Sequence, residues 1–250
     1  MGAEIFVSTR MQGVSVGGYG SLNLGRHVGD SDAAVTENRN RFFEAINADK
    51  ADFVSIQQTH GSNIRLITCD DRGRGLEKYS DAFPDTDGML TVDKNVLMAT
   101  FYADCLPLAL FDPVHKVLGL AHAGWRGTYA NIGAALLKEM TLSFGSDPRE
   151  VLFAMGPGIG FCCYEVDKTF HQRFVERYEE APQWFTAKPK NGKYYFDNTK
   201  ANTMLLKKEG ILEEHIESIS SCTCCNQRLF YSYRGSGGSC GRHGLFGRLL

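Results

Sequence analysis

Three short segments each place a potential metal ligand where an apolar run gives way to turn residues. They are 57–63 with His60, 102–107 with Cys105 and 121–128 with His122. Loops at strand ends are where α/β proteins build their sites. Two imidazoles and one thiolate suit a zinc ion with one open coordination position, which is typical of catalytic zinc. Spacing alone leaves open that these are unrelated polar residues near a core, because they match no local finger motif.

Two charged residues beside these segments are further candidates. Arg126 lies just before a predicted helix, where a guanidinium next to free backbone N–H groups can bind phosphate. It could equally be a surface residue or form a structural pair with Asp104. The carboxylate of Asp104, next to Cys105, could orient His122, act as a base, or be purely structural.

The chain has 8 cysteines. Because it is long and shows no export signal, we expect reduced thiols that pack in the core or bind metal. Cys162 and Cys163 follow a Gly-Pro-Gly turn, interpreted as shape-setting, with N–H groups that could face a substrate. One further group could form a second zinc site, although reduced core thiols are favoured because no clear C-x2-C pair stands out: Cys222, Cys224, Cys225, Cys240 and His243. Four histidines without ligand-like spacing are expected at the surface: His27, His115, His171 and His215.

The elements that must position these residues alternate between strands and helices. Apolar, β-prone runs predict strands at 53–58, 64–68, 96–103, 117–121 and 151–155. Apolar residues at helical spacing predict helices at 32–47, 128–142, 167–180 and 199–209. Residues 72–87 read as a long polar loop. Buried strands between helices indicate sheets covered by helices.

The bulk composition fits one large globular domain, or two small ones, over residues 1–250. The chain is 43% hydrophobic, enough for a sizeable core. A net charge of -2 gives no electrostatic reason to expect nucleic acid or an anionic membrane as a partner. No run approaches the ~18 apolar residues of a membrane span. The N-terminus lacks a secretory pattern, so we expect a cytoplasmic protein.

Five longer motifs carry a resemblance to a known family. They are QTHGSNI, ADCLPLALFDP, HAGWRGT, GPGIGFCCYEV and SYRGSGGSCGRHG, and the match begins at SLNLGRHVGD. Together they resemble the YfiH family, also called the multicopper polyphenol oxidase or laccase-like family, which includes bacterial YlmD and human FAMIN. The resemblance implies zinc binding, and catalysis, by His60, Cys105 and His122. It also favours Arg39 as a substrate contact over an exposed helix residue.

The resemblance implies a single domain over residues 1–250 with an α+β fold of layered mixed β-sheets flanked by helices, similar to the fold of a bacterial toxin deamidase. It further implies phosphorolysis of adenosine, inosine and methylthioadenosine, and deamination of adenosine, with purine nucleoside and phosphate as small-molecule partners. One departure bears on phosphate: the family's usual Arg-Arg pair is here Arg234 and Gly235, which removes one cation.

Three alternatives remain at this point. Two histidines and a cysteine also suit Cu²⁺, so a copper-dependent polyphenol oxidase is one. Four-electron reduction of oxygen needs several coppers, however, and few other histidines remain. A cysteine hydrolase with Cys105 as nucleophile and His122 as base is the second, and it needs no metal. The third is a binding protein with a structural zinc.

Overall fold

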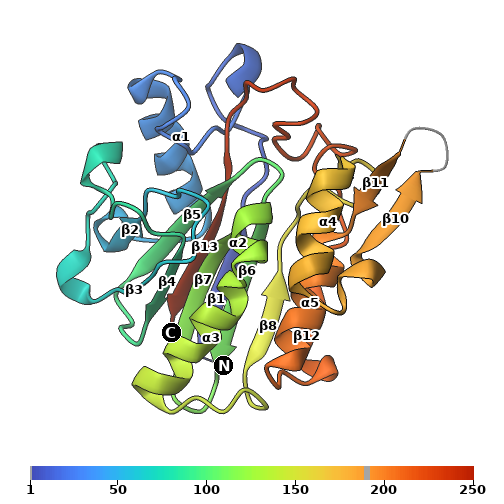
Figure 1. The fold of residues 1–250 in the computed structure, drawn as a ribbon. Coiled ribbons are helices and arrows are strands. Elements are labelled where there is room, and N and C mark those ends of the chain that lie inside the picture. Colours follow the sequence, from blue (N-terminus) through green and yellow to red (C-terminus); the bar gives the residue numbers. More distant parts are fainter. Residues whose placement is uncertain (1, 189–191) are drawn as a thin grey trace.

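The computed structural model describes residues 2–188 and 192–250 (Figure 1). The strands are β1 (Ala3–Val7), β2 (Phe53–Ser55), β3 (Ile64–Leu66), β4 (Gly88–Thr91), β5 (Leu97–Tyr102), β6 (Leu106–Asp112), β7 (Val117–Ala123), β8 (Leu152–Met155), β9 (Glu165–Val166), β10 (Phe185–Lys188), β11 (Lys193–Phe196), β12 (Ile216–Ser218) and β13 (His243–Leu249). The α-helices are α1 (Asp32–Ala45), α2 (Trp125–Tyr129), α3 (Ile132–Phe144), α4 (Lys168–Arg177) and α5 (Asn198–Lys208). Short 3-10 turns lie at Gly17–Tyr19, Lys50–Asp52, Cys69–Asp71, Tyr79–Asp81, Ala181–Trp184 and Glu213–His215.

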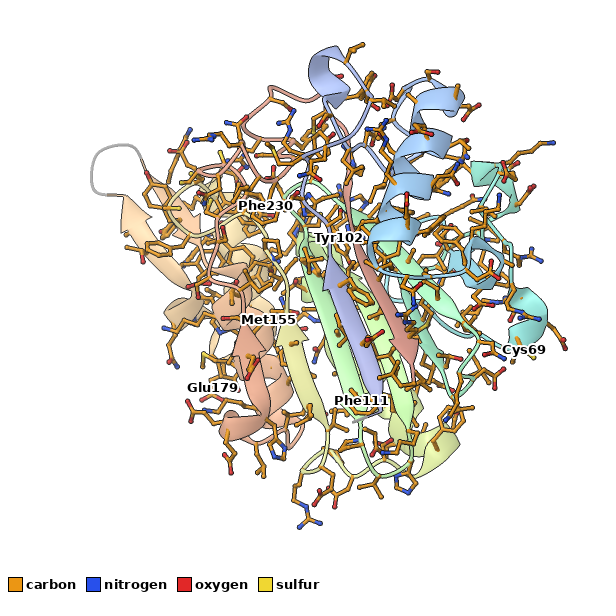
Figure 2. All side chains as sticks on the ribbon, turned by 180° about the vertical axis from the view of Figure 1, so that it is seen from behind. Cys69, Tyr102, Phe111, Met155, Glu179 and Phe230 are labelled. Carbon is orange, nitrogen blue, oxygen red and sulfur yellow. The ribbon has the colours of Figure 1, made fainter. Side chains whose placement is uncertain are left out.

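Two mixed sheets form the centre of the molecule. The larger has six strands in the order β12-β8-β6-β7-β4-β3, antiparallel except for the parallel pairs β12/β8 and β3/β4 at its edges. The smaller has four strands in the order β1-β13-β5-β2. Both β5 and β13 pack against β7, so the sheets lie face to face. Seen from behind, β1 and β13 lie in front of the larger sheet (Figure 2).

Side-chain alternation along β5 shows that the smaller sheet is buried on both faces. Met98 points into the apolar layer between the sheets, together with Leu120 of β7. Ala99 points the other way and joins Phe43 of α1 in a separate apolar cluster. Successive side chains of a strand point to opposite faces, so α1 and the larger sheet cover opposite faces of the smaller one.

Helix α3 covers the outer face of the larger sheet (Figure 1). Its Leu136 packs onto Gly119 of β7, where a Cβ would lie 2.9 Å from the leucine side chain. The order of layers is therefore helix, sheet, sheet, helix. This confirms the predicted α+β fold class of layered mixed sheets with helices outside.

Three of the four predicted helices are confirmed, with ends that shift by at most three residues in α1, α4 and α5. The helix predicted over 128–142 is present as α3, but it begins only at Ile132. The chain forms the short α2, then breaks at Asn131, which adopts a left-handed conformation at φ 59°. The Asn131 side chain accepts a hydrogen bond from the N–H of Ala134 and so caps α3.

The predicted strands are present but mostly shorter than expected. β2 ends at Ser55, followed by a bridge between Ile56 and Phe83, and β7 extends to Ala123. Several strands were not predicted, among them β6, which pairs antiparallel with both β7 and β8. A small third sheet, β10-β11-β9, packs beside α4 around the aromatic side chains of Phe174, Trp184 and Phe196. No helix within 2–188 or 192–250 has both the length and the apolar character to cross a bilayer.

Candidate metal centre and adjoining cavity

The structure brings His60, Cys105 and His122 together at one end of the two central sheets. One ligand atom from each lies within 4.8 Å of the others. His122 is in β7 and is buried, Cys105 lies between β5 and β6, and His60 is exposed in the loop between β2 and β3. Three strand ends therefore supply the group that the sequence predicted, and Figure 2 marks this region by Tyr102, the last residue of β5.

A buried carboxylate, Asp87, holds two of these residues in place. Its Oδ1 lies 2.8 Å from Nδ1 of His122, which leaves Nε2 of the ring for a metal or another partner. The same carboxylate accepts hydrogen bonds from the backbone N–H groups of Thr59, His60 and Gly61, at 2.7 to 3.0 Å. Asp87 therefore positions the His60 loop and the His122 ring together.

Sequence reasoning missed this partner and weighed Asp104 instead. In the sequence, Asp87 is the last residue of the stretch interpreted as a polar loop. The feature that could have marked it as a site residue is its position directly before β4. Asp104 has different partners: its carboxylate accepts hydrogen bonds from Oγ1 of Thr223 and from the backbone N–H of Arg234, both at 2.7 Å. Asp104 thus joins the Cys105 segment to the C-terminal loops, and does not orient His122.

The charges of Cys105, His122 and Asp87 depend on one another. Burial opposes ionisation of Cys105, but His122 and His60 outweigh it and lower the pKa of the thiol to about 6. Burial also opposes the charge on His122, yet the Cys105 thiolate and the Asp87 carboxylate raise the pKa of this imidazole to about 9. For Asp87, hydrogen bonding to His122 overcomes burial and lowers its pKa to about 2. A thiolate is thus available at neutral pH, as metal ligation requires.

Gly124, directly after β7, makes room for the ligands. A Cβ at this position would lie 2.8 Å from Cδ2 of His60 and 3.0 Å from Sγ of Cys105. Its backbone, at φ -66° and ψ 169°, is one that any residue adopts. A side chain is therefore excluded by the two ligands and not by the conformation of the chain.

A cavity of about 510 Å³ opens beside the three ligands, a size common for small-molecule sites. Its wall combines the metal ligands with aromatic rings and cationic side chains. The aromatic rings belong to Phe101, Trp125, Tyr164 and Tyr233, and the basic side chains to His27, Arg126, Arg234 and Arg242. Of these basic groups, His27 and Arg242 were missed as site residues: His27 was expected at the surface, where it is indeed exposed, but it also faces this cavity.

The two arginines singled out from the sequence lie in different environments. Arg126 is exposed in α2, lines the cavity, and has its guanidinium carbon 4.5 Å from the centre of the Trp125 ring. Arg39 is buried instead, and its guanidinium donates to the carbonyls of Leu24, Gly75 and Leu76 at 2.8 to 3.0 Å. These three bonds place Arg39 in the protein interior, so we assign it a structural part and not contact with a substrate.

The sequence left a second zinc group open but favoured reduced thiols packed in the core, and of these cysteines only Cys240 is buried. Cys222 and Cys225 lie together, but with Cys162 and Cys163 and without Cys240 or His243. The sulfur of Cys240 instead accepts a hydrogen bond from Arg242, and the structure buries Cys240 in the core. His243 is also fully buried, against the rings of Tyr102 and Phe230.

Comparison with known proteins agrees with this architecture. A family model described as multi-copper polyphenol oxidoreductase laccase matches residues 4–248. A protein named purine nucleoside phosphorylase YlmD from Bacillus subtilis is 36% identical over 238 residues, which cover 94% of this chain and 84% of that protein. Its namesake from Geobacillus stearothermophilus is 36% identical over 247 residues, 96% of this chain and 88% of the relative.

Solved structures extend the likeness to three dimensions. The hypothetical protein YfiH of Bacillus licheniformis has a TM-score of 0.96 at 34% identity, over 99% of this chain and 93% of that one. YlmD from Geobacillus stearothermophilus has a TM-score of 0.95 at 34% identity, covering 99% and 92%. The chain therefore belongs to the family described as multi-copper polyphenol oxidoreductase laccase, alongside the YfiH and YlmD proteins.

Proposed function

We propose that this protein is a zinc-dependent purine nucleoside phosphorylase that acts on adenosine, inosine and methylthioadenosine and also deaminates adenosine. The observation that carries the proposal is one cavity with three metal-binding side chains on one wall and aromatic and cationic side chains around it. Relatives over nearly the whole chain are named purine nucleoside phosphorylases, which supports the substrate class.

The residues present fit a zinc ion. His60, Cys105 and His122 offer two imidazole nitrogens and one thiolate, a donor set that leaves a fourth tetrahedral position for water or substrate. Asp87 fixes the tautomer of His122, as carboxylates do for zinc-bound histidines. When bound, zinc supplies Lewis acidity, which polarises a coordinated group and lowers the pKa of water toward neutrality.

The cavity wall suits a purine nucleoside and phosphate. Trp125, Tyr164 and Tyr233 line the cavity, and aromatic side chains of this kind can stack on a purine. Arg126 can hold phosphate near the sugar, because a guanidinium binds two phosphate oxygens at once. In phosphorolysis a bond forms between a phosphate oxygen and C1′ while the bond from C1′ to the purine nitrogen breaks. The sugar carries positive charge in between, so placing the anion close to C1′ lowers the barrier.

Deamination is proposed for the same cavity. A purine stacked on these rings can present its C6 edge toward His60, Cys105 and His122. Both activities would then depend on the same three ligands. Replacing His122 should therefore reduce them together.

Two alternatives differ in their chemistry. A copper oxidase is suggested by the description of the family, but four-electron oxygen reduction needs several coppers. Within the described residues, only one of the two groups with metal-ligand geometry contains histidine. A cysteine hydrolase is favoured by the contact of the Cys105 thiol with His122. It would be active without metal, whereas the proposed enzyme would not.

The proposal is tested by product analysis of the metal-loaded protein with adenosine, inosine or methylthioadenosine, with and without inorganic phosphate. We expect free base and ribose 1-phosphate (or its methylthio analogue) only when phosphate is present, and slower formation of inosine from adenosine. Cys105→Ala should abolish both activities, while Cys69→Ala, a matched change at an exposed cysteine away from the cavity, should abolish neither. Base release without phosphate, or full activity after metal removal, would refute the proposal.

A second variant tests how phosphate is held. Arg126→Ala should reduce phosphorolysis by about 2 kcal/mol in transition-state free energy, the loss of one charge-assisted contact, and should reduce deamination less. Arg149→Ala is the matched control, because Arg149 is exposed and paired with Asp147 away from the cavity. Equal losses of both activities in Arg126→Ala would contradict a phosphate-binding part for this residue.

A further inference from the structure

Four cysteines from two distant parts of the chain meet outside the cavity. Cys162 and Cys163 follow β8, and Cys222 and Cys225 follow β12. Since β8 and β12 are parallel neighbours, the chain leaves both strands at the same end of the sheet. A further parallel bridge between Gly158 and Cys222 continues this pairing into the loops. The topology of the sheet therefore brings the two pairs together.

The positions of the sulfurs suit a single metal ion. The four sulfurs all lie within 4.8 Å of one another. Sγ of Cys225 is 3.6 Å from Sγ of Cys162 and 3.4 Å from Sγ of Cys163. Four thiolates at ~2.3 Å from a tetrahedral zinc are separated by about 3.8 Å from one another. The two sulfurs of a disulfide lie ~2.05 Å apart, closer than any of these distances. Cys225 also has two possible disulfide partners, Cys162 and Cys163, of which it could bond only one. One metal ion would use all four sulfurs at once.

Gly160 lets the two loops approach each other, because a Cβ there would lie 3.0 Å from Cβ of Cys222 and 3.3 Å from Sγ of Cys162. Cys222 and Cys225 form a C-x2-C pair after all, hidden in the sequence by Cys224 between them. Such pairs are common in structural zinc sites.

We propose that Cys162, Cys163, Cys222 and Cys225 bind one Zn²⁺ as a closed four-thiolate site, separate from the His60, Cys105 and His122 centre. With all four tetrahedral positions taken by sulfur, it has no place for substrate, so its effect is structural. It fastens the loop after β8 to the loop after β12. Both loops border the cavity, through Ile159 and Tyr164 on one side and Tyr233 on the other.

Metal analysis of the full-length protein, purified under reducing conditions from zinc-containing medium, tests the proposal. We expect about two zinc ions per chain in the wild type, about one in Cys105→Ala and about one in Cys225→Ser. The matched control, Cys69→Ser, changes an exposed cysteine outside both groups and should keep two. A Cys105→Ala protein that holds no zinc would overturn the four-thiolate site.

X-ray absorption at the zinc edge of Cys105→Ala gives a second measurement that does not require the Cys225 variant to fold. We expect a first shell of sulfur alone at ~2.3 Å. A shell that contains nitrogen or oxygen, or a disulfide from Cys225 to Cys162 or Cys163 found by mass spectrometry, would overturn the proposal. If the wild type instead holds one zinc with only sulfur around it, this site stands and the zinc-dependent enzyme proposed above fails.

Discussion

Gly124→Ala isolates the geometry of the candidate metal centre from the stability of the fold. The backbone of Gly124 tolerates alanine, so the only conflict is the new methyl group against His60 and Cys105. To move from 2.8 Å to the 3.4 Å at which ordinary van der Waals contact begins, the His60 ring must retreat by about 0.6 Å. Metal-ligand distances tolerate only about 0.2 Å. We therefore expect zinc affinity to fall by about 10- to 100-fold, comparable to the loss of a supporting hydrogen bond.

The assay is competition for zinc with a chelator of known affinity, combined with thermal unfolding of the metal-free protein. The free energy of unfolding of the metal-free protein should change little, because the His60 side chain is exposed and its ring can turn away from the new methyl group. Gly61→Ala is the matched control: its Cβ would lie 3.5 Å from the nearest atom, and its N–H still donates to Asp87. Unchanged zinc affinity in Gly124→Ala, or an equal loss in Gly61→Ala, would refute this account of the site.

Three further changes probe the groups around the site. Asp87→Asn should weaken zinc binding by about 10- to 100-fold in the same chelator assay, because it disturbs the hydrogen bond to His122. Asp85→Asn is the control and should not weaken zinc binding, because Asp85 contacts Thr59 and Asn63 of the same loop. Arg39→Met should lower the free energy of unfolding in urea by ~3 kcal/mol, since three buried carbonyls lose a charged donor, but leave the KM for phosphate unchanged; a raised KM would return Arg39 to the substrate site. Hydrogen bonds outweigh burial and lower the pKa of Asp112 below 3.8, so the stability that this carboxylate contributes is present above pH ~4 and is lost as the pH falls through its folded-state pKa. The difference in free energy of unfolding in urea between the metal-free wild type and Asp112→Asn should therefore shrink over that range. A difference that stays constant would contradict this prediction.

In the sequence each of the three candidate ligands lies where an apolar strand meets a turn, a local feature that a single segment can display. That feature alone left open that they are unrelated polar residues, and the resemblance to the YfiH family singled them out as one ligand set. The sequence does not predict Asp87, because the bond to His122 depends on β4 pairing with β7, a contact between distant segments. The environment of Arg39 also depends on contacts between distant segments, which the sequence does not display. Its position on a helix suggests exposure, and only the packing of α1 against the smaller sheet buries it.

The prediction of helices and strands likewise succeeded where the signal was local and failed where it was not. Helices with a clear apolar face were predicted nearly to their ends, since the signal repeats over several turns. The break at Asn131 was missed, because the surrounding residues continue the helical pattern and only the left-handed conformation of this one residue interrupts it. β6 was missed because its apolar run contains Pro107, which argues against a strand in the middle of a sheet.

The Cys105 segment links the two groups of metal-binding residues. Asp104 precedes Cys105 and is held at φ 89°, a backbone conformation rare for a residue with a side chain. Its carboxylate bonds to Thr223, which lies between Cys222 and Cys225, and to the backbone of Arg234, whose own guanidinium donates to the carbonyl of Cys163. A loosened four-cysteine cluster would therefore weaken both contacts of the Asp104 carboxylate, and the Cys105 sulfur next to it could shift. On this reasoning, loss of the proposed four-cysteine zinc should weaken metal binding at the proposed His60, Cys105 and His122 centre without changing any of those three residues.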